Sequence, residues 1–147
     1  MDRGYRYHLN NINAAIGMEQ LKRAESFKDR KRAIVRQYDE RLKDIDGLKL
    51  LKHNLKETSP FSYVVRVLDG QRDHLMDYLK ELGIGTRVQF IPNHLQPVFS
   101  QYRISLPVTE KLYEEILTLP LYYEMTDDDV QMVIDGICSF YSVKSPK

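Results

Sequence analysis

The feature that most constrains the fold is a stretch without proline that runs from Asn11 to about Ile45. Apolar residues recur within it at steps of three, four and seven, and this spacing places them on one face of an α-helix. We expect an N-cap at Asn10 or Asn11 and an end at Asp46-Gly47. A straight helix of this length exceeds about 45 Å, so we expect it to support a structure outside this chain, and a break between Ser26 and Arg30 stays open.

Short strands and helices follow this first helix. A β-branched run predicts a strand over residues 63–68, and alternation predicts a second strand over residues 85–90. Between them a helix ends at Gly83 and carries its apolar face on Leu75, Tyr78, Leu79 and Leu82. After a proline-containing loop, one helix begins at Pro107 and keeps Ile116 in register, and a last helix begins with the acids after Thr126. We therefore predict an α+β fold with a small sheet covered by helices.

Composition excludes several classes of protein. Lys and Arg total 22 against 21 Asp and Glu, and the net charge of +1 gives no basic field for nucleic acid or an anionic membrane. The apolar runs are too short to cross a bilayer, and no signal-peptide core follows Met1. The single cysteine, Cys138, permits no disulfide within the chain, so we expect a cytoplasmic protein.

Local spacing does not support a metal site or an activated nucleophile. The four histidines are far apart along the chain: His8, His53, His74 and His94. Cys138 falls inside an amphipathic helix, where a thiol is usually a small core residue. The consecutive acids at 127–129 are sufficiently explained as helix-start residues that the helix dipole stabilises.

Two segments have the character of ligand contacts, and each has an ordinary alternative. Residues 4–11 place aromatic, guanidinium, imidazole and amide groups before a helix N-terminus, where anions bind, but a polar chain end explains them as well. Residues 89–97 place polar side chains on a proline-stiffened loop after a strand, yet an ordinary surface connection looks the same. Local physics leaves both alternatives open.

Taken together, these segments resemble one family, the DegT/DnrJ/StrS sugar aminotransferases. The family signature Gly-Tyr-Asn-Tyr-Arg-Met…Ile-x-Ala-Ala-Ile-Gly…Gln-Leu is similar to Gly4-Tyr5-Arg6-Tyr7-His8-Leu9 with Ile12, Ala14-Ala15-Ile16-Gly17 and Gln20-Leu21. The similarity continues in order through Gly83-Ile84-Gly85-Thr86, Pro92-x-His94-Leu95-Gln96-Pro97, Leu106-Pro107-Val108-x-Glu110, Leu119-Pro120-Leu121 and Thr126-Asp127-x-Asp129-Val130. Order and spacing across nearly the whole chain make the resemblance specific.

The resemblance implies the C-terminal part of a pyridoxal-phosphate enzyme of the aspartate-aminotransferase fold (fold type I), usually a dimer. It implies amino transfer from a donor such as glutamate to a keto-sugar nucleotide, in amino-sugar and surface-polysaccharide biosynthesis. In the family the Schiff-base lysine lies upstream of the first motif, so this chain is expected to lack it and to be inactive alone. Residues 1–47 then form a cofactor-proximal segment with a long connecting helix, and residues 48–147 form the small α+β domain.

The resemblance also implies roles for individual residues. Arg6 stands where the family has an asparagine that contacts the cofactor phosphate bound by the other subunit, and Tyr5 and Asn10 join it as expected cofactor-binding residues. The expected substrate-binding residues are Tyr7, His8, Gln89 and His94. Neither a catalytic residue nor a metal ligand is expected in this chain.

Two other hypotheses stay open. The chain would be a stand-alone, non-catalytic paralogue that regulates or pairs with a full-length relative if Met1 is a natural start instead of a fragment boundary. Alternatively, the domain itself would bind a nucleotide through its basic first residues.

Overall fold

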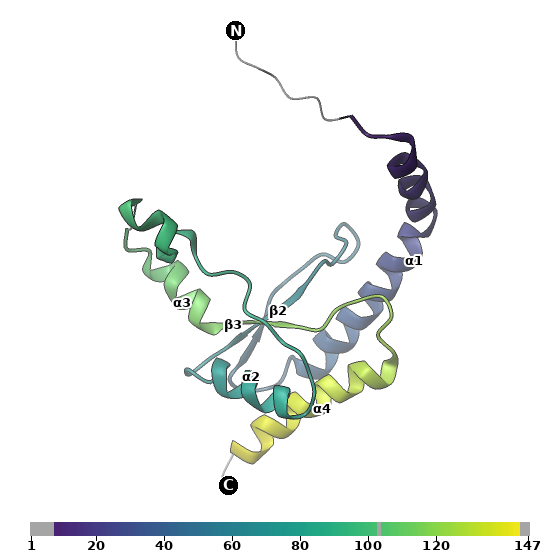
Figure 1. Ribbon diagram of the computed structural model, residues 1–147. Helices are drawn as coiled ribbons and strands as arrows, with labels where there is room; N and C mark the ends of the chain where they lie inside the picture. Colours follow the sequence, from purple (N-terminus) through teal and green to yellow (C-terminus); the bar gives the residue numbers. More distant parts are fainter. Residues whose placement is uncertain (1–7, 103, 145–147) are drawn as a thin grey trace.

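The computed structural model describes residues 8–102 and 104–144. Its elements are, in chain order, α1 (Asn11–Leu42), β1 (Leu48–Leu50), β2 (Tyr63–Val67), α2 (Arg72–Glu81), η1 (Asn93–Leu95), η2 (Pro97–Tyr102), α3 (Pro107–Glu115), β3 (Ile116–Leu119) and α4 (Asp127–Lys144). Figure 1 shows the sheet at the centre, α1 extending far beyond it on one side, and α3 extending away on the other. A small sheet with covering helices confirms the predicted α+β class.

The long first helix is continuous. α1 spans 32 residues, about 48 Å, and the break left open between Ser26 and Arg30 does not occur. The cap is Asn10, whose side-chain oxygen accepts the Asn13 N–H at 2.8 Å. The helix ends at Leu42, before the expected stop at Asp46-Gly47, and Gly47 instead supplies a left-handed residue (φ 84°) in the turn before β1.

The sheet has three antiparallel strands in the order β1-β2-β3. Leu48 lies opposite Val67, and Val65 lies opposite Leu117. The predicted strand over residues 85–90 is wrong, because only Arg87 pairs there, through an isolated bridge to Thr118. The sequence patterns did not predict β1 or β3, and Ile116 begins β3 instead of continuing the preceding helix.

One face of the sheet carries the hydrophobic core. Along β2 the buried residues alternate, so Tyr63, Val65 and Val67 face inward. The second half of α1, together with α2 and α4, covers this face (Figure 1). Fully buried side chains in these helices include Ile34, Val35, Tyr38 and Leu42 from α1, Leu75 and Leu79 from α2, and Val130, Ile134 and Ile137 from α4. The domain division at residue 47 remains a prediction, although the second half of α1 shares this core.

The start of α4 follows the predicted capping pattern. Asp129 Oδ2 accepts hydrogen bonds from the backbone N–H and the hydroxyl of Thr126, both at 2.8 Å. The Thr126 hydroxyl oxygen in turn accepts the Asp129 N–H at 3.1 Å, which completes a reciprocal cap. These hydrogen bonds hold the pKa of Asp129 below its usual value. The neighbouring Asp127 accepts a hydrogen bond from Arg30 at 2.9 Å, so the acids at 127–129 serve the helix start and its tie to α1.

Candidate functional site

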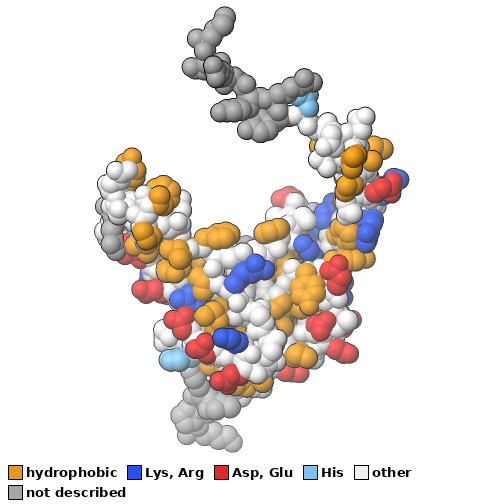
Figure 2. Space-filling model, viewed as in Figure 1, with side chains coloured by type: hydrophobic (Ala, Val, Ile, Leu, Met, Phe, Trp, Pro, Cys, Tyr) orange, Lys and Arg blue, Asp and Glu red, His pale blue; other side chains and the backbone are white. Residues whose placement is uncertain are grey.

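Exposed apolar side chains border the face between the two projecting parts of the molecule. Figure 2 shows hydrophobic groups on the tip of α1 and on the opposite arm, which we define as residues 91–115, with basic groups between them. The exposed apolar residues near the first half of α1 are Leu9, Ile12, Ile16, Met18 and Leu21, and those of the arm include Ile91, Val98, Phe99, Tyr102, Ile104 and Val108. Apolar surface on this scale marks a surface that contacts another protein or domain.

A hollow of about 340 Å³ lies where the middle of α1 meets the ends of β2 and β3. Lys31 of α1 and the segment 85–89 line it together with Phe61, Pro120 and Tyr122. Gly85, Arg87 and Gln89 face it as alternate residues of one extended segment. The Lys31 ammonium lies 6.0 Å from the centroid of the exposed Phe61 ring. We call this hollow the basic pocket.

Among the expected substrate-binding residues that the structure describes, which are His8, Gln89 and His94, only Gln89 lines the basic pocket. His94 is buried within the arm, with its Nε2 3.1 Å from Glu110 Oε1. The same carboxylate oxygen accepts the Leu106 N–H at 2.9 Å, so the pair ties η1 to the start of α3. The structure therefore does not place His94 beside Gln89 in the pocket.

The expected cofactor-proximal residues lie at the start of the chain. Tyr5, Arg6 and Tyr7 are outside the described residues. His8 is exposed, and Asn10 uses its amide oxygen to cap α1. The Asn10 side chain is therefore exposed, and its observed contact is with the N-terminus of the helix that follows it.

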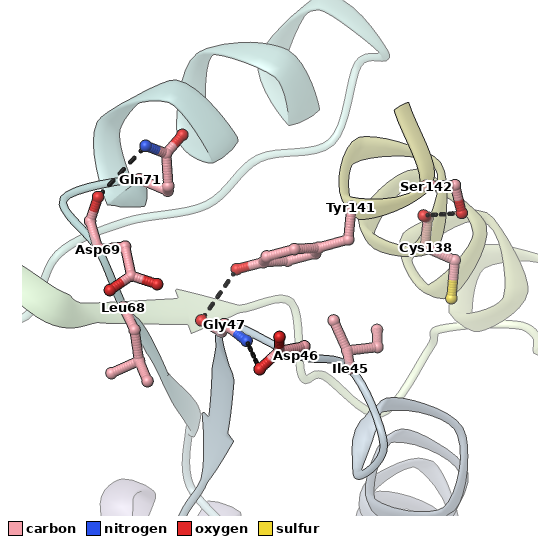
Figure 3. Close-up of a pocket in the computed structure, with 9 residues that line it drawn as sticks. All are labelled: Ile45, Asp46, Gly47, Leu68, Asp69, Gln71, Cys138, Tyr141 and Ser142. Atoms are coloured by element: carbon pink, nitrogen blue, oxygen red, sulfur yellow. Dashed lines mark hydrogen bonds between the residues drawn. The ribbon is translucent and has the colours of Figure 1, made fainter. Parts of the chain in front are cut away.

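A second hollow, of about 430 Å³, was not indicated by any sequence pattern and lies between the end of α4 and the turns at 45–47 and 68–71 (Figure 3). The Tyr141 hydroxyl donates to Gly47 O at 3.2 Å, and the Ser142 hydroxyl donates to Cys138 O at 2.8 Å. Burial, with the nearby charge of Asp69, raises the pKa of Tyr141 to about 12. The phenol stays protonated near neutral pH, so it joins α4 to the turn before β1 and does not act as a base.

A third cluster joins α1 to the loop before β2. Asp39 accepts a hydrogen bond from the Tyr63 hydroxyl at 2.8 Å, and its second oxygen lies 2.9 Å from His53 Nε2. Burial and the Asp39 carboxylate raise the pKa of Tyr63 well above its usual value. These two contacts tie α1 to β2 and to the loop before it. The other members of the cluster are 14 and 24 residues from Asp39, and no local motif signals it.

The described part of the chain offers no alternative site of two common kinds. Within residues 8–102 and 104–144, no three His, Cys, Asp or Glu side chains come close enough to hold a metal ion. None of the helices in those ranges is long and apolar enough to span a membrane.

The sequence of this chain is similar to that of a known protein family. The model of the DegT/DnrJ/EryC1/StrS aminotransferase family matches residues 1–138. The protein MJ1066 of Methanocaldococcus jannaschii is 35% identical over 143 residues, which cover 91% of this chain and 37% of that protein. The chain thus spans little more than a third of the curated relative.

Solved structures agree with this match. The sugar aminotransferase CalS13 from Micromonospora echinospora is 30% identical, with a TM-score of 0.84 over 92% of this chain and 37% of that one. The aminotransferase TlmJ from Streptoalloteichus hindustanus is 32% identical, with a TM-score of 0.87 over 97% of this chain and 39% of that one. Most of this chain therefore corresponds to less than half of a longer chain in each case.

Proposed function

Because the chain belongs to the DegT/DnrJ/EryC1/StrS aminotransferase family, we propose that it is the C-terminal part of a pyridoxal-phosphate-dependent sugar aminotransferase. The whole protein would move an amino group from a donor such as glutamate to a keto-sugar nucleotide. The observation that carries this proposal is the family match over residues 1–138, together with the TM-score of 0.84 to a sugar aminotransferase. When bound, the cofactor supplies the electron sink for such a reaction.

The described residues do not by themselves fit the cofactor. A lysine that forms a Schiff base must be desolvated to be reactive near neutral pH. Lys22 is exposed and paired with Glu19, and every other lysine whose side chain is described is exposed or only half-buried. We therefore derive no chemical step from this chain and propose that the reactive lysine belongs to the larger, N-terminal part of the enzyme.

What this chain would contribute is the positioning of ligands. In the proposed dimer, Arg6, Tyr5 and Asn10 would contact the cofactor phosphate of the other subunit, and Tyr7 and His8 would line the adjoining substrate site. Gln89 would reach the sugar from the basic pocket, where it is half-buried. The His94–Glu110 contact would give His94 a positioning role, because it fixes the arm that carries it.

The exposed apolar residues support the proposal of a missing partner region. The first half of α1 and the arm would pack against the N-terminal domain, which removes Ile12, Ile16 and Val108 from water. This accounts for a helix of 32 residues of which only the second half meets the core.

The test is to express the uninterrupted reading frame that contains this chain and to assay it with pyridoxal phosphate, glutamate and a keto-sugar nucleotide. We expect amino transfer by the longer protein and none by residues 1–147 alone. Amino transfer by the 147-residue chain would contradict the proposed division of labour. A reading frame that starts at Met1 would contradict the enzyme proposal and favour the non-catalytic partner.

A further inference from the structure

A hollow of about 290 Å³ lies between α1 and residues 51–64, which form the loop before β2 and the start of that strand. We call this hollow the loop pocket. We propose that the loop pocket binds a small apolar molecule that carries one hydroxyl or N–H group, and that His53 accepts the hydrogen bond from this group. All the contacts involved belong to described residues of this chain, so the site does not depend on the proposed amino transfer.

The walls of the loop pocket are mostly apolar. The buried Val35 of α1 lines it, together with Leu55, Pro60 and Val64 from the loop and the strand. Leu51 lines it as well and is 47% exposed, so a ligand seated there removes apolar surface from water. The volume of about 290 Å³ is close to the lower end of the range of small-molecule sites, which indicates a small occupant.

Hydrogen bonds hold the loop that lines this pocket. The backbone oxygen of Asn54 accepts the Thr58 N–H at 2.9 Å and the Thr58 hydroxyl at 2.7 Å, and its side-chain oxygen accepts the Lys56 N–H at 3.1 Å. The guanidinium of Arg32 in α1 donates to Thr58 O at 3.3 Å from both Nε and Nη2. A wall that is fixed before binding loses little conformational entropy when a ligand enters.

The hydrogen bonds of Asp39 determine which nitrogen of His53 carries the proton. The Tyr63 hydroxyl donates to one oxygen of Asp39 at 2.8 Å, and the other oxygen lies 2.9 Å from His53 Nε2. Because a carboxylate only accepts hydrogen bonds, Nε2 carries the hydrogen, and Nδ1 of the neutral imidazole is an acceptor. Among the described residues, Nδ1 of His53 has no hydrogen-bond partner.

An acceptor beside apolar walls selects a ligand with a donor. His53 lines the loop pocket and Asp39 does not, so Nδ1 is the imidazole nitrogen that remains for a ligand there. The His53 side chain is only 26% exposed, and a hydrogen bond that is partly shielded from water is stronger than one at the open surface. Lys52 and Ser62 also line the pocket, but both are exposed to water. The match is an apolar molecule with one hydroxyl or N–H group.

The test is a titration of the 147-residue chain with phenol, toluene and benzoate, followed by the amide NMR shifts. The three probes share one ring and present a donor, no polar group and a carboxylate. We expect phenol to bind about fivefold more tightly than toluene, the value of one neutral hydrogen bond, with the shifts concentrated in residues 51–64. Equal affinities for phenol and toluene, shifts spread over the whole chain, or no binding would each overturn the proposal. Tighter binding of benzoate would assign recognition to Lys52 and overturn it as well.

The matched variants are His53→Phe and His74→Phe. Each replaces an imidazole by another aromatic ring, but His74 is exposed on α2 and does not line the loop pocket. We expect His53→Phe to abolish the preference for phenol and to leave the affinity for toluene nearly unchanged, whereas His74→Phe should change neither affinity. A preference for phenol that survives in His53→Phe, or that disappears in His74→Phe, would contradict the assignment of His53. Circular dichroism of each variant separates a lost contact from a lost fold.

The tautomer of His53 can be measured without any substitution. At about pH 8, where an imidazole is neutral, the nitrogen NMR shifts of His53 in the unsubstituted chain should show the proton on Nε2. A proton on Nδ1 would overturn the proposal, because that nitrogen would then be a donor. If the longer protein transfers no amino group while the preference for phenol holds, the proposed function fails and this site stands.

Discussion

The two halves of α1 differ sharply although they belong to one continuous helix. In the first half, residues 11–18 contain no charged side chain, yet Ile12, Ile16 and Met18 are exposed. In the second half, Ile34, Val35, Tyr38 and Leu42 are buried in the core between charged residues that face water. Apolar residues in a helix therefore do not reveal whether their partner lies in the same chain. The contrast is consistent with our proposal that the first half packs against a region outside the described residues.

The largest expected difference is in the free energy of unfolding when a leucine is replaced by alanine in each half of α1. Leu42→Ala removes a fully buried side chain and should lower the free energy of unfolding by about 2–5 kcal/mol. Leu21→Ala, at a side chain that is 74% exposed, should change it by less than about 0.5 kcal/mol. Urea denaturation of both variants measures the difference. Similar losses at the two positions would mean that the first half of α1 is packed in the isolated chain.

A smaller effect should appear at the helix caps. Thr126→Ala breaks the reciprocal cap at the start of α4, whose residues fill the core, and should cost about 1 kcal/mol. Asn10→Ala removes the single side-chain cap hydrogen bond at the exposed end of α1 and should leave global stability nearly unchanged while the first turn frays. Denaturation together with amide hydrogen exchange at residues 11–16 distinguishes global loss from local fraying. A global loss at Asn10 as large as that at Thr126 would contradict the contrast.

The hydrogen bond from Tyr141 of α4 to Gly47 should make the free energy of unfolding depend on pH in the alkaline range. The pKa of Tyr141 is raised from 10.0 to about 12 in the folded chain, so the folded state holds its proton more tightly than the unfolded state. The contribution of Tyr141 to the free energy of unfolding is fully present below pH 10 and is lost as the pH rises toward 12. Tyr141→Phe should flatten this part of the stability profile relative to the unchanged chain. The same slope in both proteins between pH 10 and 12 would exclude Tyr141 as its source.

The smallest change in stability should accompany a clear change in association. The double substitution Ile12→Gln and Ile16→Gln alters only exposed side chains, so we expect the free energy of unfolding to change by less than about 0.5 kcal/mol. Because the substitution removes apolar surface, it should reduce self-association of the 147-residue chain in sedimentation experiments. Arg36→Gln, elsewhere on the same helix, is the control. If the unsubstituted chain is monomeric, this would contradict the premise that the exposed apolar surface of α1 associates with another molecule.

The sequence by itself determined the elements whose signal is local. The helical periodicity of α1 appears in the structure, and the strand predicted over residues 63–68 forms over residues 63–67. The helix end near Gly83 and the cap at Thr126 also appear. Motif order also identified the family. These features depend on residues within a few positions of one another, where helix periodicity, side-chain alternation and capping chemistry act.

Only the tertiary structure decided which segments pair and which charges meet. β1 is three residues long, too short for a pattern, and Ile116 suits a helix period as well as a strand until β2 binds its backbone. Lys31 and Arg87 are distant in sequence, and no spacing rule brings them to one hollow. Likewise, the periodicity of α1 could not distinguish its buried half from its exposed half. Burial and pairing depend on partners distant in the chain, and local sequence does not contain those partners.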